Sequence, residues 1–109
     1  MRYLVVGPDG QCIGGTGNLD MASLQALVGG DFEVMPSPLD IRVTVLAPAN
    51  AKREGRPANH AATRLLAGRL RPDDFVAGVV VVTGPIDAAG ALTDLTDEAA
   101  AAVTERVAV

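Results

Sequence analysis

Few residues of this sequence combine a reactive side chain with a spacing that catalysis uses. His60 is the only histidine and Cys12 the only cysteine, and their wide separation in the chain gives little support to a metal site. His60 beside Asp31 or Glu33 would suit general acid or base work, but nothing in the spacing brings these groups together. Neither serine lies in a nucleophile-elbow context. We therefore expect no catalytic residue, no metal and no cofactor.

A glycine-rich segment, residues 14–18 (GGTGN), lies between an expected strand and an expected helix. Backbone N–H groups and a helix dipole at such a place can hold a phosphate. The spacing is neither the Rossmann nor the P-loop pattern, and the Lys-Ser/Thr pair of the P-loop is missing. A flexible loop is the simpler interpretation. The alternative hypothesis is a small-ligand or nucleotide-binding domain, or an enzyme, that uses His60 with Gly14, Gly15, Thr16 and Gly17.

Basic residues gather in residues 52–71, which hold six of the nine Lys and Arg residues and a single acid, Glu54. This stretch has a net charge near +5, whereas the rest of the chain is near −9. A domain so divided attracts anionic partners to one face. Nucleic acid fits the arginines but not the net acidity or the scarcity of aromatic stacking groups, so an acidic protein is an equal candidate. The candidate partner-binding residues are Asn50, Lys52, Arg53, Arg56, Asn59, Arg64 and Arg71.

The two asparagines of this set also have structural interpretations. Asn59 precedes an expected helix and suits its N-cap, and Asn50 is able to close a turn through its side chain. As amides they could equally contact a base, a sugar or a peptide backbone. Both interpretations stay open at this point.

Composition predicts one globular domain, residues 1–109. The chain is 49% hydrophobic, enough to form a core at this length. A single cysteine excludes an internal disulfide and favours a reducing compartment. The longest apolar run, residues 75–82, is far shorter than the ~20 residues of a membrane-spanning helix. We expect a cytoplasmic protein.

Apolar periodicity predicts the elements. Strands are expected at residues 2–6, 31–35, 41–45 and 75–82, with a short hairpin limb at 11–13 and an exposed loop at 47–57. Helices are expected after the N-caps Asp20, Asn59 and Thr96, the first ending at Gly29 and Gly30. The order β-α-β-β-α-β-α predicts an α+β fold, a small antiparallel or mixed sheet with helices on one face. The ferredoxin-like arrangement is one version of it.

Four segments in order carry a family resemblance. Residues 24–33 (LQALVGGDFE), 50–59 (NAKREGRPAN), 74–84 and 95–98 (LTDE) resemble the sequence pattern of the uncharacterised family called domain of unknown function 3846. The resemblance covers about three quarters of the chain. It implies an origin in bacterial chromosomes, phages or mobile elements, and it implies no activity, cofactor or catalytic residue.

These observations favour a non-enzymatic binding or regulatory module over an enzyme. Its surface is expected around residues 47–71, and its partner is an acidic protein or a nucleic acid. No membrane partner is expected. A homo-oligomer that packs its sheet or last helix against a second copy is a further hypothesis.

Overall fold

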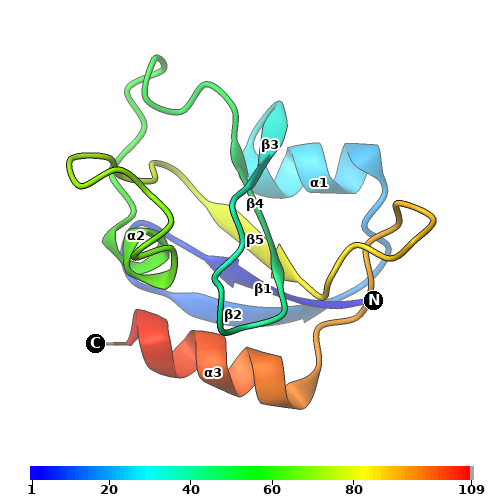
Figure 1. The fold of residues 1–109 in the computed structure, drawn as a ribbon. Coiled ribbons are helices and arrows are strands. Elements are labelled where there is room, and N and C mark those ends of the chain that lie inside the picture. Colours follow the sequence, from blue (N-terminus) through cyan, green and yellow to red (C-terminus); the bar gives the residue numbers. More distant parts are fainter. Residues whose placement is uncertain (109) are drawn as a thin grey trace.

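The computed structural model describes residues 1–108 as one five-stranded sheet with three helices (Figure 1). The elements in chain order are β1 (Arg2–Val6), β2 (Cys12–Thr16), α1 (Met21–Val28), β3 (Phe32–Met35), β4 (Thr44–Pro48), α2 (His60–Leu65), β5 (Val80–Thr83) and α3 (Asp97–Val107). No helix among these is long and apolar enough to cross a membrane.

The sheet has the order β2-β1-β5-β4-β3, and every neighbouring pair is antiparallel. Two hairpins, β1 with β2 and β3 with β4, are joined through β5 in the centre. The α+β class is confirmed. The ferredoxin-like version is wrong, because a split βαβ unit contains parallel strands. The hairpin limb expected at residues 11–13 is confirmed as β2, which runs further, from Cys12 to Thr16, after a tight turn closed by Gly7 and Gln11.

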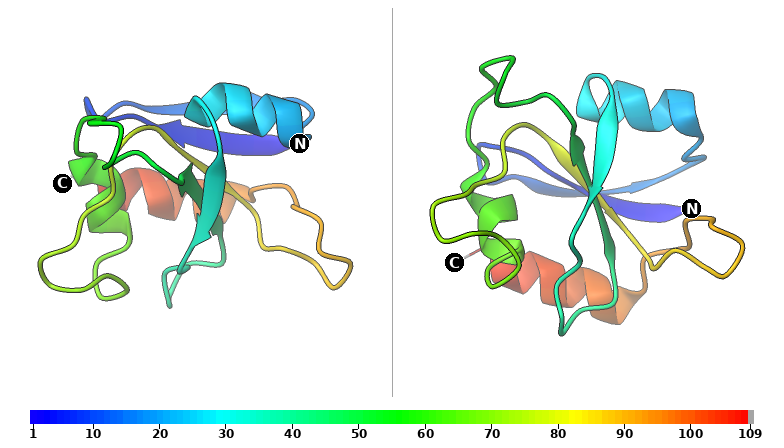
Figure 2. Two further views of the ribbon diagram at one scale, coloured as in Figure 1. Left: turned by 90° about the horizontal axis from the view of Figure 1, so that it is seen from above. Right: turned by 45° about the horizontal axis from the view of Figure 1, so that its top comes forward.

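Helices cover both faces of the sheet (Figure 2), so the expectation of helices on one face is wrong for α1. Leu24 of α1 packs with Leu46 and Val81 on one face. On the other face, α2 and α3 pack over Val45 and Val82. Successive residues of a strand point to opposite faces, and the central strands are apolar on both. Two buried layers therefore need helices on two sides.

Side-chain caps begin each helix as the sequence predicts. Asp20 Oδ1 accepts from Ser23 N–H at 2.8 Å, and Thr96 Oγ1 accepts from Ala99 N–H at 3.1 Å. Asn59 caps α2 in the same way. Gly29 ends α1 with a φ of 81°, a left-handed conformation that favours glycine.

Two strands are shorter than their apolar runs. The predicted strand 75–82 begins only at Val80, since Gly78 has a φ of 81° and breaks the extended backbone. An added Cβ at Gly78 would also lie 2.9 Å from Pro48 Cγ. The strand predicted at 41–45 begins at Thr44. The loop predicted at 47–57 begins only after Pro48, because β4 extends to that residue. It is also not exposed throughout, since Ala51 is buried.

Candidate functional site

The fold divides the basic stretch instead of presenting it as one face. Lys52 forms an ion pair with Asp74. Arg64 Nη2 donates to the carbonyl of Val107 at 2.7 Å, near the end of α3. Arg53 is exposed and has no ion-pair or hydrogen-bond partner within residues 1–108. The cations predicted as a single partner surface therefore have different roles.

Arg56 is a structural residue that caps α1 from a distant loop. Its Nη1 and Nη2 donate to the carbonyls of Val28 and Gly29, each at 2.5 Å. A cation at the C-terminal end of a helix also meets the negative end of its dipole. Glu54 lies 3.0 Å from the same guanidinium. These contacts account for the Arg56 side chain without a partner.

Asn59 is fully buried, so its cap interpretation is confirmed and its amide is not on a surface. The Nδ2 atom donates to Val6 at 3.0 Å and to Gly78 at 2.8 Å, while Oδ1 accepts from Ala62 N–H at 3.0 Å. A partner has no access to these atoms in the folded state. Asn50 remains on the surface.

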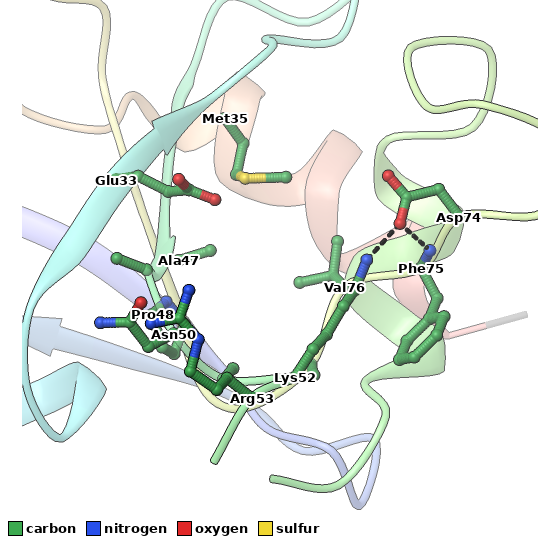
Figure 3. Close-up of a pocket in the computed structure, with 13 residues that line it drawn as sticks. Glu33, Met35, Ala47, Pro48, Asn50, Lys52, Arg53, Asp74, Phe75 and Val76 are labelled. Carbon is green, nitrogen blue, oxygen red and sulfur yellow. Dashed lines mark hydrogen bonds and ion pairs between the residues drawn. The ribbon is translucent and has the colours of Figure 1, made fainter. Parts of the chain in front are cut away.

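The first hollow beside the basic stretch, here called the loop groove, has a volume of about 280 Å³. Figure 3 shows Glu33 on one side, with Asp74 and Phe75 across from it and Val76 between. Two apolar residues of the floor, Met35 and Ala47, come from β3 and β4. Asn50, Lys52 and Arg53 also line it. The groove thus joins three predicted partner-binding residues to the edge of the sheet.

The charges of the loop groove balance. Asp74 accepts from both the Lys52 ammonium and Phe75 N–H. The Lys52 hydrogen bond, with this second one, holds the pKa of Asp74 below its ordinary value. The Lys52 ammonium also lies 4.6 Å from the centre of the Phe75 ring, within cation–π range. Arg53 and Glu33 supply one further charge of each sign, so this groove does not select an anion by net charge.

The second hollow, here called the arginine hollow, has a volume of about 320 Å³ and lies beside α2 and α3. Three arginines and one aspartate line it. Its lining residues are Pro38, Leu39, Asp40, Arg64, Ala67, Gly68, Arg69 and Arg106. Arg106 binds Asp40 through both terminal nitrogens, one of them at 3.0 Å from Oδ1. This pairing lowers the pKa of Asp40 and raises that of Arg106.

Two cations of the arginine hollow remain without a carboxylate. Arg64 bonds only a carbonyl, and its Nε is the single buried side-chain nitrogen or oxygen in the described part of the chain that lacks a partner. Arg69 is exposed and has no ion pair within residues 1–108. Sequence reasoning named Arg64 but missed Arg69 as a site residue and missed Arg106 entirely. No signal in the sequence indicates that α3 brings Arg106 to α2.

The other predicted residues do not join either hollow. Arg71 is exposed and lines neither. Gly14, Gly15 and Thr16 belong to strand β2, where they lie opposite Leu4, Tyr3 and Arg2, respectively. The prediction that these residues form a loop is therefore wrong. Of the four glycine-rich candidates, only Gly17 follows the strand.

His60 lies at the start of α2 and is exposed. It follows Asn59, which binds the carbonyl of Val6. Val6 lies opposite Cys12, and Gly17 is five residues further along β2 and its end, a span of about 16 Å at 3.3 Å per residue. Gly14 is nearer, two residues from Cys12 along β2. Within residues 1–108, no three His, Cys, Asp or Glu side chains are grouped to hold a metal ion.

The fold and the two hollows define a small antiparallel α+β domain with charged concave surfaces. The chain belongs to the family "domain of unknown function (DUF3846)", whose sequence profile matches residues 1–108. Comparison with curated proteins and with solved structures finds no match.

Proposed function

We propose that this protein is a non-enzymatic binding module that holds an acidic segment of a partner protein in the arginine hollow. The observation that carries the proposal is the excess of cations there. Asp40 balances Arg106, whereas Arg64 and Arg69 have no carboxylate within residues 1–108. Guanidinium groups bind carboxylates in a planar, bidentate way that fixes orientation as well as affinity.

Arg64 is held in position before any partner arrives. The bond from Nη2 to the carbonyl of Val107 ties the guanidinium to α3, and the side chain is half-buried. A fixed side chain loses less conformational entropy on binding than a mobile one. Arg69 lies at the exposed rim, where a cation speeds the approach of an anionic partner.

The rim favours a protein over a nucleic acid. Leu39 is 84% exposed and lies beside buried Pro38 at the hollow. An apolar side chain next to arginines suits a protein interface, where such anchors carry much of the binding energy. The chain has a net charge of −4, which opposes wrapping by a phosphate backbone. The exposed aromatic ring that could stack on a base, Phe75, lies in the other hollow.

The test uses a fluorescein-labelled decapeptide of alternating Glu and Leu, measured by fluorescence anisotropy. We expect Arg69→Glu to weaken its binding at least about tenfold, and binding to weaken further as salt is raised. Arg71→Glu is the matched control, because it makes the same change of charge outside the hollow. Equal losses in the two variants would show general charge attraction and contradict the proposal.

Two further probes separate the partner classes. A decapeptide of alternating Gln and Leu should not bind. A single-stranded DNA decamer should bind more weakly than the acidic peptide at equal salt. Tighter binding of the DNA, lost in Arg69→Glu, would reassign the hollow to nucleic acid. Heteronuclear NMR of the arginine Nε–H groups should show shifts at Arg64 and Arg69 before any at Arg71.

The cellular context belongs to the same proposal. We place the protein in the cytoplasm, since its one cysteine suits a reducing compartment. A phage or mobile element as carrier is supported only by the family resemblance. The genes that neighbour this one test that origin. Genes for integration or replication would support it, and a biosynthetic operon would contradict it.

A further inference from the structure

We propose that the free edge of β3, together with the loop groove, binds an extended peptide segment of another protein as an added strand of the sheet. This site is separate from the arginine hollow and does not depend on it. Strand addition uses two features together, namely unpaired backbone groups for affinity and a pocket for alternate side chains. Both are found at β3.

The hydrogen-bond pattern shows which backbone groups of β3 face outward. Just before the strand, Ala49 N–H donates to the carbonyl of Asp31 at 2.9 Å. In an antiparallel pair, residues that exchange hydrogen bonds recur at every second position. Glu33 therefore bonds β4, whereas the N–H and C=O groups of Phe32 and Val34 face away from the sheet. The sheet order leaves this side of β3 unpaired within residues 1–108.

The loop groove lies on the face that an added strand would use for specificity. Glu33 and Met35, two residues apart, line it from β3, and Ala47 lines it from β4. Figure 3 shows their side chains directed into the hollow, with Val76 at its floor. Alternate side chains of an added strand lie on this same face. One apolar side chain of the peptide thus reaches Met35 and Val76.

Unpaired charges of both signs indicate the chemistry of the peptide. Glu33 and Arg53 line the groove, and neither has an ion-pair partner within residues 1–108. An acidic peptide would meet Glu33 as a like charge, and a basic one would meet Arg53. The groove therefore fits a segment that carries one acidic and one basic side chain with an apolar residue between them.

The opposite edge of the sheet, β2, is also unpaired within residues 1–108 but has fewer side chains for recognition. There β2 contains Gly14 and Gly15, which give a peptide no side chains to recognise. Glycine also adds conformational freedom that binding must remove. The edge of β2 provides a control position on the same sheet.

The experiment selects peptides from a phage-displayed random decapeptide library on the full chain. The tightest clone is synthesised and then N-methylated one residue at a time. We expect affinity to fall at least about tenfold at every second residue and little at the others, because strand pairing uses alternate N–H groups. The same peptide should slow hydrogen exchange at the Val34 amide and not at Gly14. Enrichment of no peptide, or losses without a period of two, would overturn the proposal.

Variants of the chain locate the site independently. Val34→Pro removes one outward N–H at an edge position, where proline is tolerated. It should weaken the selected peptide at least about tenfold, while Gly14→Pro should leave binding unchanged. Arg69→Glu should also leave it unchanged, which separates this site from the arginine hollow. Equal effects of Val34→Pro and Gly14→Pro contradict the assignment, and the N-methyl series decides the matter if Val34→Pro does not fold.

Discussion

The side-chain amide of Asn59 donates a 3.0 Å hydrogen bond to the backbone carbonyl of Val6, 53 residues earlier in the chain. A second bond from the same nitrogen reaches Gly78, just before β5. Val6 lies in β1, which pairs with β5. One buried amide therefore joins the start of α2 to β1 and to the segment that leads into β5.

Asn59→Ala should destabilise the domain strongly. It removes the α2 cap and leaves the carbonyls of Val6 and Gly78 without this donor in the interior. Such losses cost about 1 kcal/mol for a cap and about 1–3 kcal/mol for a buried unsatisfied group, so we expect a decrease of about 2–4 kcal/mol. Urea unfolding measures it. Asn50→Ala, on the exposed loop, is the matched control, and equal effects would refute the role assigned to Asn59.

Arg56→Glu and Arg53→Glu make the same change of charge three positions apart and should differ in stability. Arg56 donates to the carbonyls of Val28 and Gly29, and hydrogen bonds to charged groups contribute about 1.5–3 kcal/mol in proteins. We expect Arg56→Glu to lose about 1–3 kcal/mol. Arg53→Glu should stay within about 0.5 kcal/mol. Thermal unfolding of both variants at equal salt measures the difference, and a stable Arg56→Glu protein would contradict the cap.

Val80→Asp should abolish folding. Val80 has no exposed surface and lies in the central strand, where an ionised carboxylate has no partner. Val34→Asp is the control, because Val34 is 56% exposed on an edge strand. Circular dichroism and exclusion chromatography should show an unfolded Val80→Asp chain and a folded Val34→Asp chain. A cooperative melt of Val80→Asp near the wild-type temperature would mean that the central strand is assigned wrongly.

Acid should weaken the fold through three carboxyl groups. The backbone N–H of Ser23 lowers the pKa of Asp20, Arg106 lowers that of Asp40, and Lys52 lowers that of Asp74. Each lowered pKa means that folding favours the charged form, so the stabilisation is present above the ordinary value of 3.8 and is lost as the pH falls through the folded-state pKa.

The measurement compares the wild type with a variant that carries Asp20→Asn, Asp40→Asn and Asp74→Asn. The wild type should melt at a higher temperature than the variant near neutral pH. The difference between the two melting temperatures should shrink as the pH falls below about 4. A difference that stays constant with pH would show that these carboxylates do not contribute through their charge.

Local patterns were sufficient to predict much of the fold. Alternation in residues 31–35 predicts β3, and Asp20 and Thr96 mark helix starts that the structure confirms. The valines that fill both faces of residues 80–82 predict an inner strand. These features depend on neighbours within a few positions, where propensity and capping operate.

The candidate sites depend on contacts between distant segments, which one sequence does not reveal. Arg56 acts on the end of α1, 28 residues earlier. Arg64 and Arg106 meet only because α2 packs against α3. A run of basic residues predicts charge but not whether a carbonyl, a carboxylate or solvent receives each cation.

The position of β5 in the sheet also sets the order in which the chain can be completed during synthesis. Both outer hairpins are made before residue 80, and neither pairs with the other; β5 alone joins them. Until β5 is translated, the inner edges of β1 and β4 stay open beside their valines, a state prone to association between chains. A chain whose synthesis stops before residue 80 therefore keeps two separate hairpins, each with an open inner edge that can pair with another chain. Synthesis of β5 closes both edges at once and so protects the earlier part of the chain from association.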